Sequence, residues 1–443
     1  MSFPSPSMPT KLTQRQIVII AIAALVVIGG LTLFILNLRS SSSGYSAQNL
    51  TIWGTDSPKA FNDMISKYTG PGSGTQTSIK YTQISAANYQ SQVLAAIAAG
   101  NGPDIFEIGN RDLPQWRSVL LPIPANFAST FNLATLGQDF PDVVSQDFVS
   151  GGYIYALPLS VDTLAMIYNK DLLNTAGIAT LPKTWSQFDA DIPLLRQENS
   201  AGQITQAAAA LGGSEASIGN APDIVFLMML QNGTQMLSSD GSSVAFASTG
   251  GTSGAAGQNA FAFYLQFSNA SSPYYTWNDS MGNALDAFAQ GKVAIIFDYS
   301  SALASIKAKS PFLNYGVAAV PQADNAATAV NYAKYNGLAV NKNSPNALAA
   351  WQFVIGLTTN ATDENIYTSD TGAPPALRSA IAADMTDPVM SVFALQALTA
   401  KSWYESNGAT IDNAVNTAIG QVLTGSADST TALNEAQSQI NGG

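Results

Sequence analysis

Short apolar runs alternate with segments of helical spacing in the first quarter of the chain. The runs predict β-strands at Leu50–Trp53, 78–84 and 104–108. Between them, residues 58–68 and 89–99 place apolar side chains three and four positions apart, which predicts helices with one buried face. Strands that alternate with helices in this way favour a parallel sheet covered by helices on both faces.

The same alternation continues towards the C-terminus. Further strands are expected at 164–169, 293–297, 315–320 and 335–340, and further helices at 186–198, 345–358, 389–400, 411–423 and 429–440. At 443 residues the chain is longer than one typical domain. The predicted fold class is therefore α/β, with two lobes.

The segment from Gly152 to Asp162 reads as a strand that leaves one lobe and crosses to the other at Pro158. Proline fixes φ and lacks an N–H donor, so it suits a connection better than the interior of a sheet. A returning strand near Asn336 would complete the hinge. These crossings predict lobe one at residues 50–157 and 337–372, and lobe two at residues 161–333 and 373–443.

The N-terminal region contains a candidate membrane span. Residues 17–36 are uncharged and mostly apolar, and a helix of about 20 residues spans roughly 30 Å, one bilayer core. The nearby Tyr45-Ser-Ala47 is a poor signal-peptidase site because tyrosine is bulky. We therefore expect an uncleaved signal anchor, a single-pass transmembrane helix, rather than a removed signal peptide.

Residues on either side of this span predict its orientation. Lys11 and Arg15 precede it, which favours a cytoplasmic N-terminus over residues 1–16. Residues 37–49 are rich in serine and are typical of a flexible linker. The rest of the chain would then be extracellular and tethered to the cell membrane.

Composition narrows the classes of function. The chain has neither cysteine nor histidine, which excludes disulfides, cysteine-ligated metals, serine–histidine catalysis and a lipid-modified N-terminal cysteine. Its net charge of −11 argues against nucleic acid as a partner. The sequence also lacks an Asp-x-Asp-x-Asp-Gly calcium loop. We expect no cofactor and no metal site, and an enzyme would depend on carboxylate, tyrosine or lysine chemistry.

Several separate segments match, in order, the pattern of a known family. They are Gly102-Pro-Asp-Ile-Phe106, Tyr155-Ala-Leu-Pro158, Tyr168-Asn-Lys-Asp171, Pro182-Lys-Thr-Trp185, Phe288-Ala-Gln-Gly-Lys-Val-Ala294 and Ala418 to Gly425. Over nearly all of residues 50–443 the chain resembles extracellular solute-binding protein family 1, the maltose-binding-protein-like receptors of sugar-type ABC importers. It departs from that pattern in its predicted anchor, its missing lipid-modified cysteine and its few lysines.

This resemblance implies both a fold and a function. The fold is the two-lobe periplasmic-binding-protein-like fold, with a cleft between the lobes. The ligand is a small molecule, a mono- or oligosaccharide, and its binding favours the closed state. The closed receptor, a monomer, delivers the ligand to the permease subunits of an ABC transporter. The resemblance thus points to a binding protein rather than an enzyme.

Candidate ligand residues follow the ends of predicted strands, where doubly wound folds place their binding groups. This rule selects Trp53, Thr55, Asp56, Asn110 and Arg111. Asn336 and Gly337 are candidates because they lie near the returning crossing, and Trp277 is a weaker candidate. Relatives place a carboxylate after the crossing, an aromatic residue after a lobe-two strand and a C-terminal aromatic residue against the sugar. The matching positions are Asp162, Tyr299 with Ser300, and Trp403 with Tyr404.

Each candidate also has a purely structural reading. Trp53 could belong to the core and Asp56 could cap a helix, while Arg111 could pair with its neighbour Asp112. With few cations near these positions, a neutral carbohydrate fits better than a phosphate, a nucleotide or an acidic peptide.

Two other functions stay open. Asp162 and Asp298 could form the carboxylate pair of a secreted glycan-active hydrolase. The chain could also be a surface-binding protein without a transport role. Activity on chromogenic glycosides separates the first alternative from a receptor, and a ligand-induced thermal shift separates the second.

Overall fold

A computed structural model describes the chain at residues 49–69, 78–250, 254–383, 386–403 and 407–442. The expected span at 17–36, its flanking segments up to residue 48, and Tyr404 lie outside these ranges. Among the residues inside them, no helix combines the length and the apolar character needed to cross a membrane.

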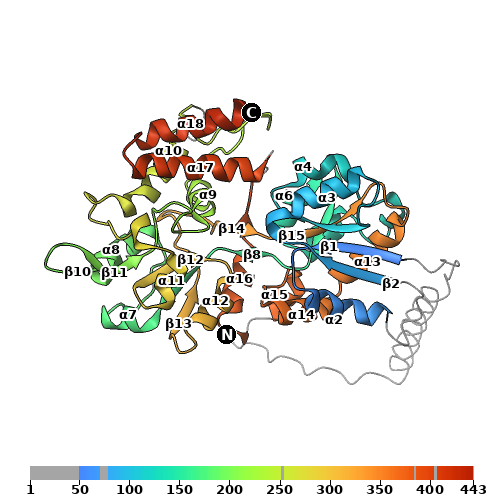
Figure 1. Cartoon of the computed structure of the whole chain (residues 1–443), viewed down its shortest axis with the longest axis horizontal. Helices are drawn as coiled ribbons and strands as arrows, with labels where there is room; N and C mark the ends of the chain where they lie inside the picture. The colour runs from blue at the N-terminus through green and yellow to red at the C-terminus, as the bar shows by residue number, and fades with distance from the viewer. Residues whose placement is uncertain (1–48, 70–77, 251–253, 384–385, 404–406, 443) are drawn as a thin grey trace, which may run out of the picture. The chain divides into compact units, whose positions relative to one another are not determined.

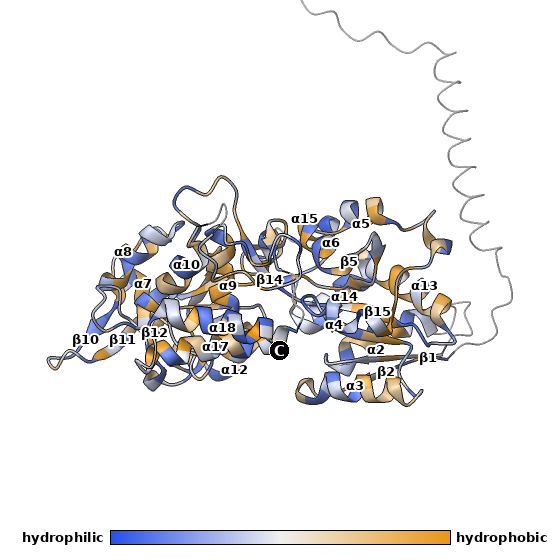
Figure 2. Ribbon diagram, turned by 90° about the horizontal axis from the view of Figure 1, so that it is seen from above, coloured by the Kyte–Doolittle hydropathy of each residue, from blue (hydrophilic) through white to orange (hydrophobic). Residues whose placement is uncertain are grey.

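From Asn49 onward the chain forms one compact unit, and its described residues hold two separate hydrophobic cores. We call lobe 1 the part packed around Phe61 and Trp351, and lobe 2 the part packed around Phe188 and Trp277. Figure 1 shows the two groups of elements on either side of β14 (Asn331–Lys334), and Figure 2 shows the same division from above.

Lobe 1 is built on a sheet in the order β2-β1-β3-β15-β4, with β7 also paired to β15. The strands are β1 (Asn49–Gly54), β2 (Ser78–Gln83), β3 (Ile105–Gly109), β4 (Leu120–Leu121), β7 (Ala156–Pro158) and β15 (Asn336–Asn341). The first three are parallel to one another, as the sequence predicted, and β15 runs antiparallel to β3. The ends of β1 and β3 and the start of β15 therefore lie at one edge.

Helices cover this sheet. They are α2 (Pro58–Thr69), α3 (Tyr89–Ala98), α4 (Leu113–Trp116), α5 (Leu133–Asp139), α6 (Asp142–Phe148), α13 (Ala347–Thr358), α14 (Ala361–Thr371) and α15 (Arg378–Ala383). In α2, the predicted apolar face with Phe61, Met64 and Ile65 is buried. A hairpin of β5 (Val149–Ser150) and β6 (Tyr153–Ile154) follows α6.

Lobe 2 has a sheet in the order β10-β11-β12-β9-β13. Its strands are β9 (Ala165–Asn169), β10 (Gln197–Glu198), β11 (Ile204–Ala209), β12 (Val293–Asp298) and β13 (Tyr315–Ala318). The end of β12 lies beside the start of β9, because Asp298 pairs with Ala165. The candidate residues Tyr299 and Ser300 therefore leave the sheet at the same edge where the chain enters it.

The helices of lobe 2 come from both halves of the sequence. They are α7 (Lys170–Thr175), α8 (Trp185–Leu195), α9 (Ala221–Gln231), α10 (Ala256–Leu265), α11 (Ala284–Ala289), α12 (Ala302–Lys309), α17 (Gly408–Leu423) and α18 (Ser429–Gly442). The Thr184 hydroxyl accepts a hydrogen bond from the Gln187 amide and so caps α8. α9 buries eight apolar residues together with Asp223, and these apolar residues explain why the helix lies deep inside the lobe.

The segments that join the lobes form a small sheet of their own. Its order is β16-β14-β8, with β8 at Asp162–Thr163 and β16 at Ala400–Lys401. β14 runs parallel to β16 and antiparallel to β8. Along each of these strands, or just beyond it, the buried residues change from the core of one lobe to the core of the other. The chain therefore crosses between the lobes at these three places.

The third crossing differs from the expected boundary between residues 372 and 373. Ala376, Leu377 and Ile381 pack in the lobe 1 core. The buried Glu364 carboxylate accepts hydrogen bonds from the backbone amides of residues 376 and 377, and the Arg378 side chain donates to the Phe140 carbonyl. These contacts hold the segment on lobe 1, and the chain crosses only at β16. α16 (Met390–Ala397) lies between the two cores.

Pro158 lies inside the lobe 1 sheet rather than at a crossing. It ends the edge strand β7 and pairs with Gly337 of β15. An edge strand tolerates proline because its outward-facing side needs no N–H donor. The crossing follows a few residues later, at β8.

Gly337 provides a test of this packing. A Cβ atom at Gly337 would lie 2.6 Å from the Phe148 ring and 3.0 Å from the Ala156 Cβ. Gly337→Ala should therefore lower the free energy of unfolding by about 1–3 kcal/mol through overpacking, measured by urea denaturation.

The matched control is Gly420→Ala in α17. No atom lies within 4 Å of a Cβ at Gly420, so the better helix propensity of alanine should leave stability unchanged or raise it by up to about 1 kcal/mol. Equal destabilisation by the two variants would contradict the packing role of Gly337.

Candidate functional site

The lobe 1 candidates gather where β1 ends and β15 begins. Thr55 follows β1, and its backbone N–H and hydroxyl both donate to Glu107 Oε2, at 2.9 and 3.0 Å. The Asn336 amide nitrogen lies 3.5 Å from the same oxygen. Asp56 accepts a hydrogen bond from the Tyr367 hydroxyl. The structure thus brings Thr55 and Asn336 together around a carboxylate that the sequence did not single out.

Trp53 is half-buried and packs against the lobe 1 core. Its carbonyl oxygen lies 3.0 Å from the Tyr89 hydroxyl, which also accepts the Glu107 N–H at 2.7 Å. The hydroxyl therefore stands between the ends of β1 and β3, which pair only up to Trp53 and Phe106.

Asn110 fixes the crossing strand β14. Its amide nitrogen donates to Asp147 Oδ2 at 3.0 Å, and its carbonyl oxygen accepts the Tyr335 N–H at 3.2 Å. Asp147 also accepts hydrogen bonds from the Tyr335 and Ser402 hydroxyls. Burial raises the pKa of Asp147 to about 7, although these hydrogen bonds favour its charged form. Asn110 thus holds two chain segments together in this structure.

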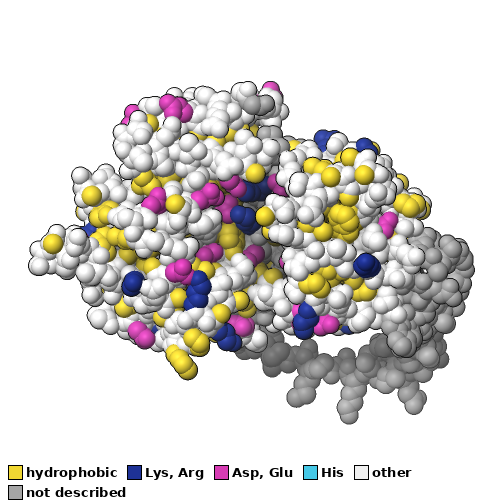
Figure 3. Space-filling model, in the orientation of Figure 1, with side chains coloured by type: hydrophobic (Ala, Val, Ile, Leu, Met, Phe, Trp, Pro, Cys, Tyr) yellow, Lys and Arg dark blue, Asp and Glu magenta, His cyan; other side chains and the backbone are white. Residues whose placement is uncertain are grey.

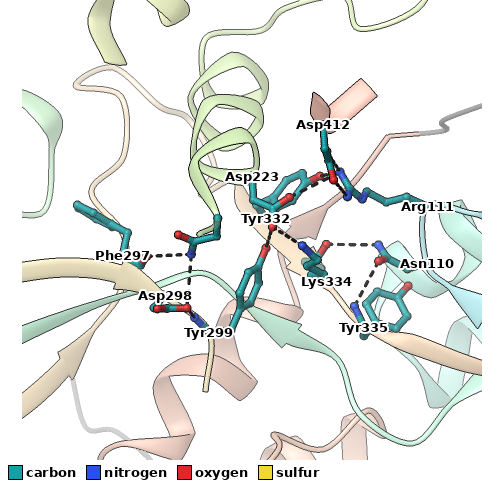
Figure 4. A network of polar contacts seen from close by, with 12 residues as sticks. Asn110, Arg111, Asp223, Phe297, Asp298, Tyr299, Tyr332, Lys334, Tyr335 and Asp412 are labelled. Atoms are coloured by element: carbon teal, nitrogen blue, oxygen red, sulfur yellow. Dashed lines mark hydrogen bonds and ion pairs between the residues drawn. The ribbon is translucent and has the colours of Figure 1, made fainter. Parts of the chain in front are cut away.

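Arg111 reaches from lobe 1 into lobe 2 (Figure 4). Its guanidinium binds Asp412 of α17 through two hydrogen bonds, of 3.0 and 2.6 Å. It also donates to the Tyr332 hydroxyl at 3.2 Å and lies over the Phe226 ring, 6.0 Å from its centroid. The side chain is only 8% exposed. Asp412, rather than the expected neighbour Asp112, is therefore its principal ionic partner.

Asp223 joins Arg111 to a second cation. Its Oδ1 lies 3.6 Å from the guanidinium, and its Oδ2 accepts the Lys334 ammonium and the Tyr299 hydroxyl, each at 2.9 Å. Burial opposes the charge on Asp223, but Lys334 and Arg111 outweigh it and lower its pKa. The candidate Tyr299 therefore donates a hydrogen bond to a largely buried ionic network that links both lobes.

Asp162 and Ser300 bind each other at the first crossing. The Ser300 N–H and hydroxyl donate to Asp162 Oδ2 at 3.0 and 2.7 Å, and the Thr163 N–H donates to Oδ1 at 2.8 Å. Burial raises the pKa of Asp162 to about 7 against these hydrogen bonds. Asp298 is close enough for its charge to raise that pKa further. The carboxylate is thus fixed rather than left as a mobile surface group.

Trp277 and Trp403 lie in the core of lobe 2, at 1% and 4% exposure. The Trp277 indole donates to the Ser217 hydroxyl at 3.1 Å, and Trp403 packs edge-on against Phe226 and Phe246. Gly337 is buried in the lobe 1 sheet. These contacts are packing contacts, and a ligand role for the three residues stays a prediction. Tyr404 lies outside the described residues.

The sequence reasoning missed Glu107, Asp223, Lys334 and Asp412. Two of them stand out in the sequence as acidic residues inside apolar segments. Glu107 interrupts the apolar strand Ile105–Gly109, and Asp223 opens the apolar helix α9. An acidic residue inside a buried element needs a partner, so each could have been marked as part of a polar site. Lys334 and Asp412 carried no such signal.

Acidic and basic side chains meet between the two halves of the molecule. Figure 3 shows both kinds gathered around a hollow there. The basic groups that bridge this region are Arg111 and Lys334, and each is bound to carboxylates. The described residues hold no group of three or more acidic side chains arranged for a metal ion.

The profile of the bacterial extracellular solute-binding proteins matches residues 53–364. The chain belongs to this family. The matched part includes the lobe 2 sheet, the lobe 1 sheet except for the first residues of β1, and the first two crossings of this solute-binding protein.

Two curated proteins illustrate the similarity. The diacetylchitobiose binding protein DasA of Streptomyces coelicolor is 28% identical over 175 residues, 38% of each chain. A binding protein of Brucella abortus is 27% identical over 266 residues, 58% of each chain. The match thus spans less than two thirds of the length of either relative.

Solved structures match over more of the chain. The sugar-binding protein MalE from Xanthomonas citri has a TM-score of 0.74 at 19% identity, over 89% of this chain and 97% of that one. The cyclic alpha-maltosyl-1,6-maltose binding protein from Arthrobacter globiformis has a TM-score of 0.72 at 19% identity, over 90% and 99%. They confirm the predicted two-lobe periplasmic-binding-protein-like fold.

The buried pair between Arg111 and Asp412 predicts a stability effect. Arg111→Ala leaves Asp412 without its two hydrogen bonds and Asp223 with one cation fewer. Breaking a buried ion pair costs about 3–5 kcal/mol, and we expect the lower end because Asp412 is 23% exposed. Urea denaturation measures the change.

Lys309→Ala is the control for this prediction. Lys309 and Asp286 form an ion pair in which both side chains are about half exposed, and such pairs contribute about 0–1 kcal/mol. A loss for Arg111→Ala no larger than that for Lys309→Ala would show that the interlobe pair adds no stability.

Proposed function

We propose that the protein is the extracellular substrate-binding protein of an ABC importer. It binds a carbohydrate in the cleft between its lobes and delivers it to the permease subunits. Membership of the solute-binding family carries this proposal. The strand-end groups Thr55, Asp56 and Asn336 support it from lobe 1, as Asp162 and Ser300 do from the start of lobe 2. The receptor acts as a monomer.

The ionic network favours an uncharged ligand. Arg111 is bound by Asp412, and Lys334 is bound by Asp223. An anionic ligand would have to displace one of these carboxylates, and Asp412 or the buried Asp223 would then lose its ionic partner, which is costly for a desolvated charge. A neutral sugar instead needs fixed hydrogen-bonding groups, which the carboxylates and amides at the strand ends supply. DasA, by its name, binds diacetylchitobiose, a neutral disaccharide.

The hydrolase alternative is less favoured. Glycoside hydrolysis needs one carboxyl group that reaches the leaving-group oxygen and a second that activates water or attacks the sugar. Both oxygens of Asp162 already accept hydrogen bonds from the chain, and Asp298 accepts the Tyr299 N–H. The family is one of binding proteins. Release of nitrophenol from nitrophenyl glycosides by the purified protein would revive this alternative.

A thermal-shift panel tests the proposed function. The neutral probes are maltotetraose, mannobiose, diacetylchitobiose and tagatose, and the anionic comparators are glucose 6-phosphate and gluconate. A probe at about 100 times its Kd stabilises the folded state by about 2.7 kcal/mol, which should raise Tm by several degrees. The anionic comparators should leave Tm unchanged. Shifts with the comparators alone would contradict a neutral carbohydrate ligand.

We also propose that residues 17–36 tether the protein to the cell membrane as a single-pass signal anchor, with 37–49 as the linker. The uncharged, apolar sequence of this segment supports the proposal. The binding lobes then lie outside the cell, at residues 50–443.

The anchor predicts how the protein fractionates. The full chain should sediment with membranes and keep its N-terminus, whereas the double variant Leu25→Arg, Ile28→Arg should lose membrane association because two charges at the centre of a span are costly. Ser42→Arg in the linker is the control and should behave as wild type. A mature protein that begins near Gln48 would show instead that the segment is a cleaved signal peptide.

A further inference from the structure

Glu107 is an acidic residue in the middle of a buried strand. It lies at the third position of β3, among apolar neighbours, and is 3% exposed. A buried carboxyl group without partners is costly, and packing alone would favour an apolar side chain here. Its contacts therefore indicate what the acid contributes.

These contacts lead to the ligand-facing edge of lobe 1. Glu107 Oε2 accepts both hydrogen bonds from Thr55 and lies 3.5 Å from the Asn336 amide nitrogen. One oxygen thus connects the turn after β1 to the start of β15, two segments that are far apart in the sequence. Asp56, next to Thr55, belongs to the same turn.

The second oxygen of Glu107 occupies space that only glycine allows. A Cβ atom at Gly54 would lie 2.2 Å from Glu107 Oε1 and 2.6 Å from the Tyr81 hydroxyl. Among the described residues, Oε1 has no hydrogen-bond partner. Because Gly54 has no side chain, the space beneath the turn is open to the Glu107 carboxyl group. Only one oxygen of that group accepts hydrogen bonds from the described residues.

We propose that Glu107 is a positioning residue that sets the geometry of the carbohydrate site by holding the Thr55–Asp56 turn and Asn336 in place from inside lobe 1. The inference rests on the proposed function. Glu107 acts through Thr55 and Asn336, since its own carboxyl group is closed off from solvent.

The surroundings of Glu107 favour its uncharged form. The groups that face it are the hydroxyls of Tyr81, Tyr89 and Tyr367 and the carboxylate of Asp56, with no cation among its described contacts. Burial first, and then the charge of Asp56, raise the pKa of Glu107 to about 8. A protonated Glu107 still accepts the Thr55 hydrogen bonds through Oε2 and leaves Asp56 as the charged acceptor of the turn.

This arrangement gives ligand affinity a definite pH dependence. A ligand that covers the turn removes water from around Asp56, so the charge of Asp56 is screened less and favours uncharged Glu107 more strongly in the complex than in the free protein. The complex then holds a proton that the free protein releases near pH 8, so affinity falls as the pH rises above that value. A shift of one pKa unit on binding corresponds to a tenfold loss.

The test compares Glu107→Gln with wild type in the full chain. The amide oxygen can accept the Thr55 hydrogen bonds, and the side chain stays neutral at every pH. Titration calorimetry with the carbohydrate probe that gives the largest thermal shift should show wild-type affinity falling about tenfold between pH 6.5 and 9.5. Glu107→Gln should match wild type at pH 6.5 and change less than twofold over the range.

Glu364→Gln is the matched control. Glu364 is also a buried lobe 1 acid, and one of its oxygens has no hydrogen-bond partner among the described residues. Burial raises its pKa to about 7, and its other oxygen accepts the backbone amides of Ala376 and Leu377 rather than any group of the turn. This variant should keep the wild-type pH profile of affinity. If both variants lost the pH dependence of ligand affinity, that dependence would reflect general stability, and the positioning role would be overturned.

Hydrogen exchange of the ligand-free chain gives a second reading. The Thr55 amide should exchange about tenfold faster in Glu107→Leu, which lacks an acceptor, and at the wild-type rate in Glu107→Gln. Unchanged exchange in the leucine variant overturns the inference. The inference is also overturned if carbohydrate binds to wild type and to Glu107→Gln with the same pH dependence of affinity. The proposed function stands in that case, because the carbohydrate still binds. Failure of every carbohydrate probe to bind wild type overturns the proposed function itself, together with the role inferred for Glu107.

Discussion

A desolvated ion pair joins the two lobes in this structure. Arg111 leaves the lobe 1 sheet and ends inside lobe 2, bound to Asp412 and close to Asp223. Such a pair contributes little net stability compared with apolar packing, but losing one partner is costly. The positions of α9, α17 and the crossing strand β14 therefore all depend on where one guanidinium lies. Through Asp223, Tyr299 and Lys334 extend the same constraint to the end of β12 and to β14.

The fold followed from the sequence because it depends on local patterns. Alternation of apolar runs and helical faces predicted the parallel strands β1, β2 and β3, and the apolar face of α2. The third crossing did not follow, since nothing local marks it. The segment after Gly372 stays on lobe 1 because of contacts with Glu364 and Phe140, which are tertiary and leave no periodic trace.

The candidate site was harder to predict for a related reason. The strand-end rule predicts which residues lie at the edge of a sheet, but not which side chains they contact. It placed Arg111 correctly at the edge of lobe 1, yet its principal ionic partner lies 301 residues away, on α17. The resemblance to the family suggested Trp403 as an aromatic residue for the sugar, whereas Trp403, like Trp277, lies in the lobe 2 core. The rule did not select Glu107, because this residue precedes the end of its strand and only its side chain extends to Thr55.

The sheet made by β8, β14 and β16 gives the connection between the lobes a mechanical character. Three separate linkers could slide past one another, and the lobes could then move in many directions. Backbone hydrogen bonds join these three segments side by side, so sliding would break the ladder. Sheets yield more readily to twist, their natural deformation. The connection should therefore behave as a short torsion strip, about which the lobes rotate while they resist shear.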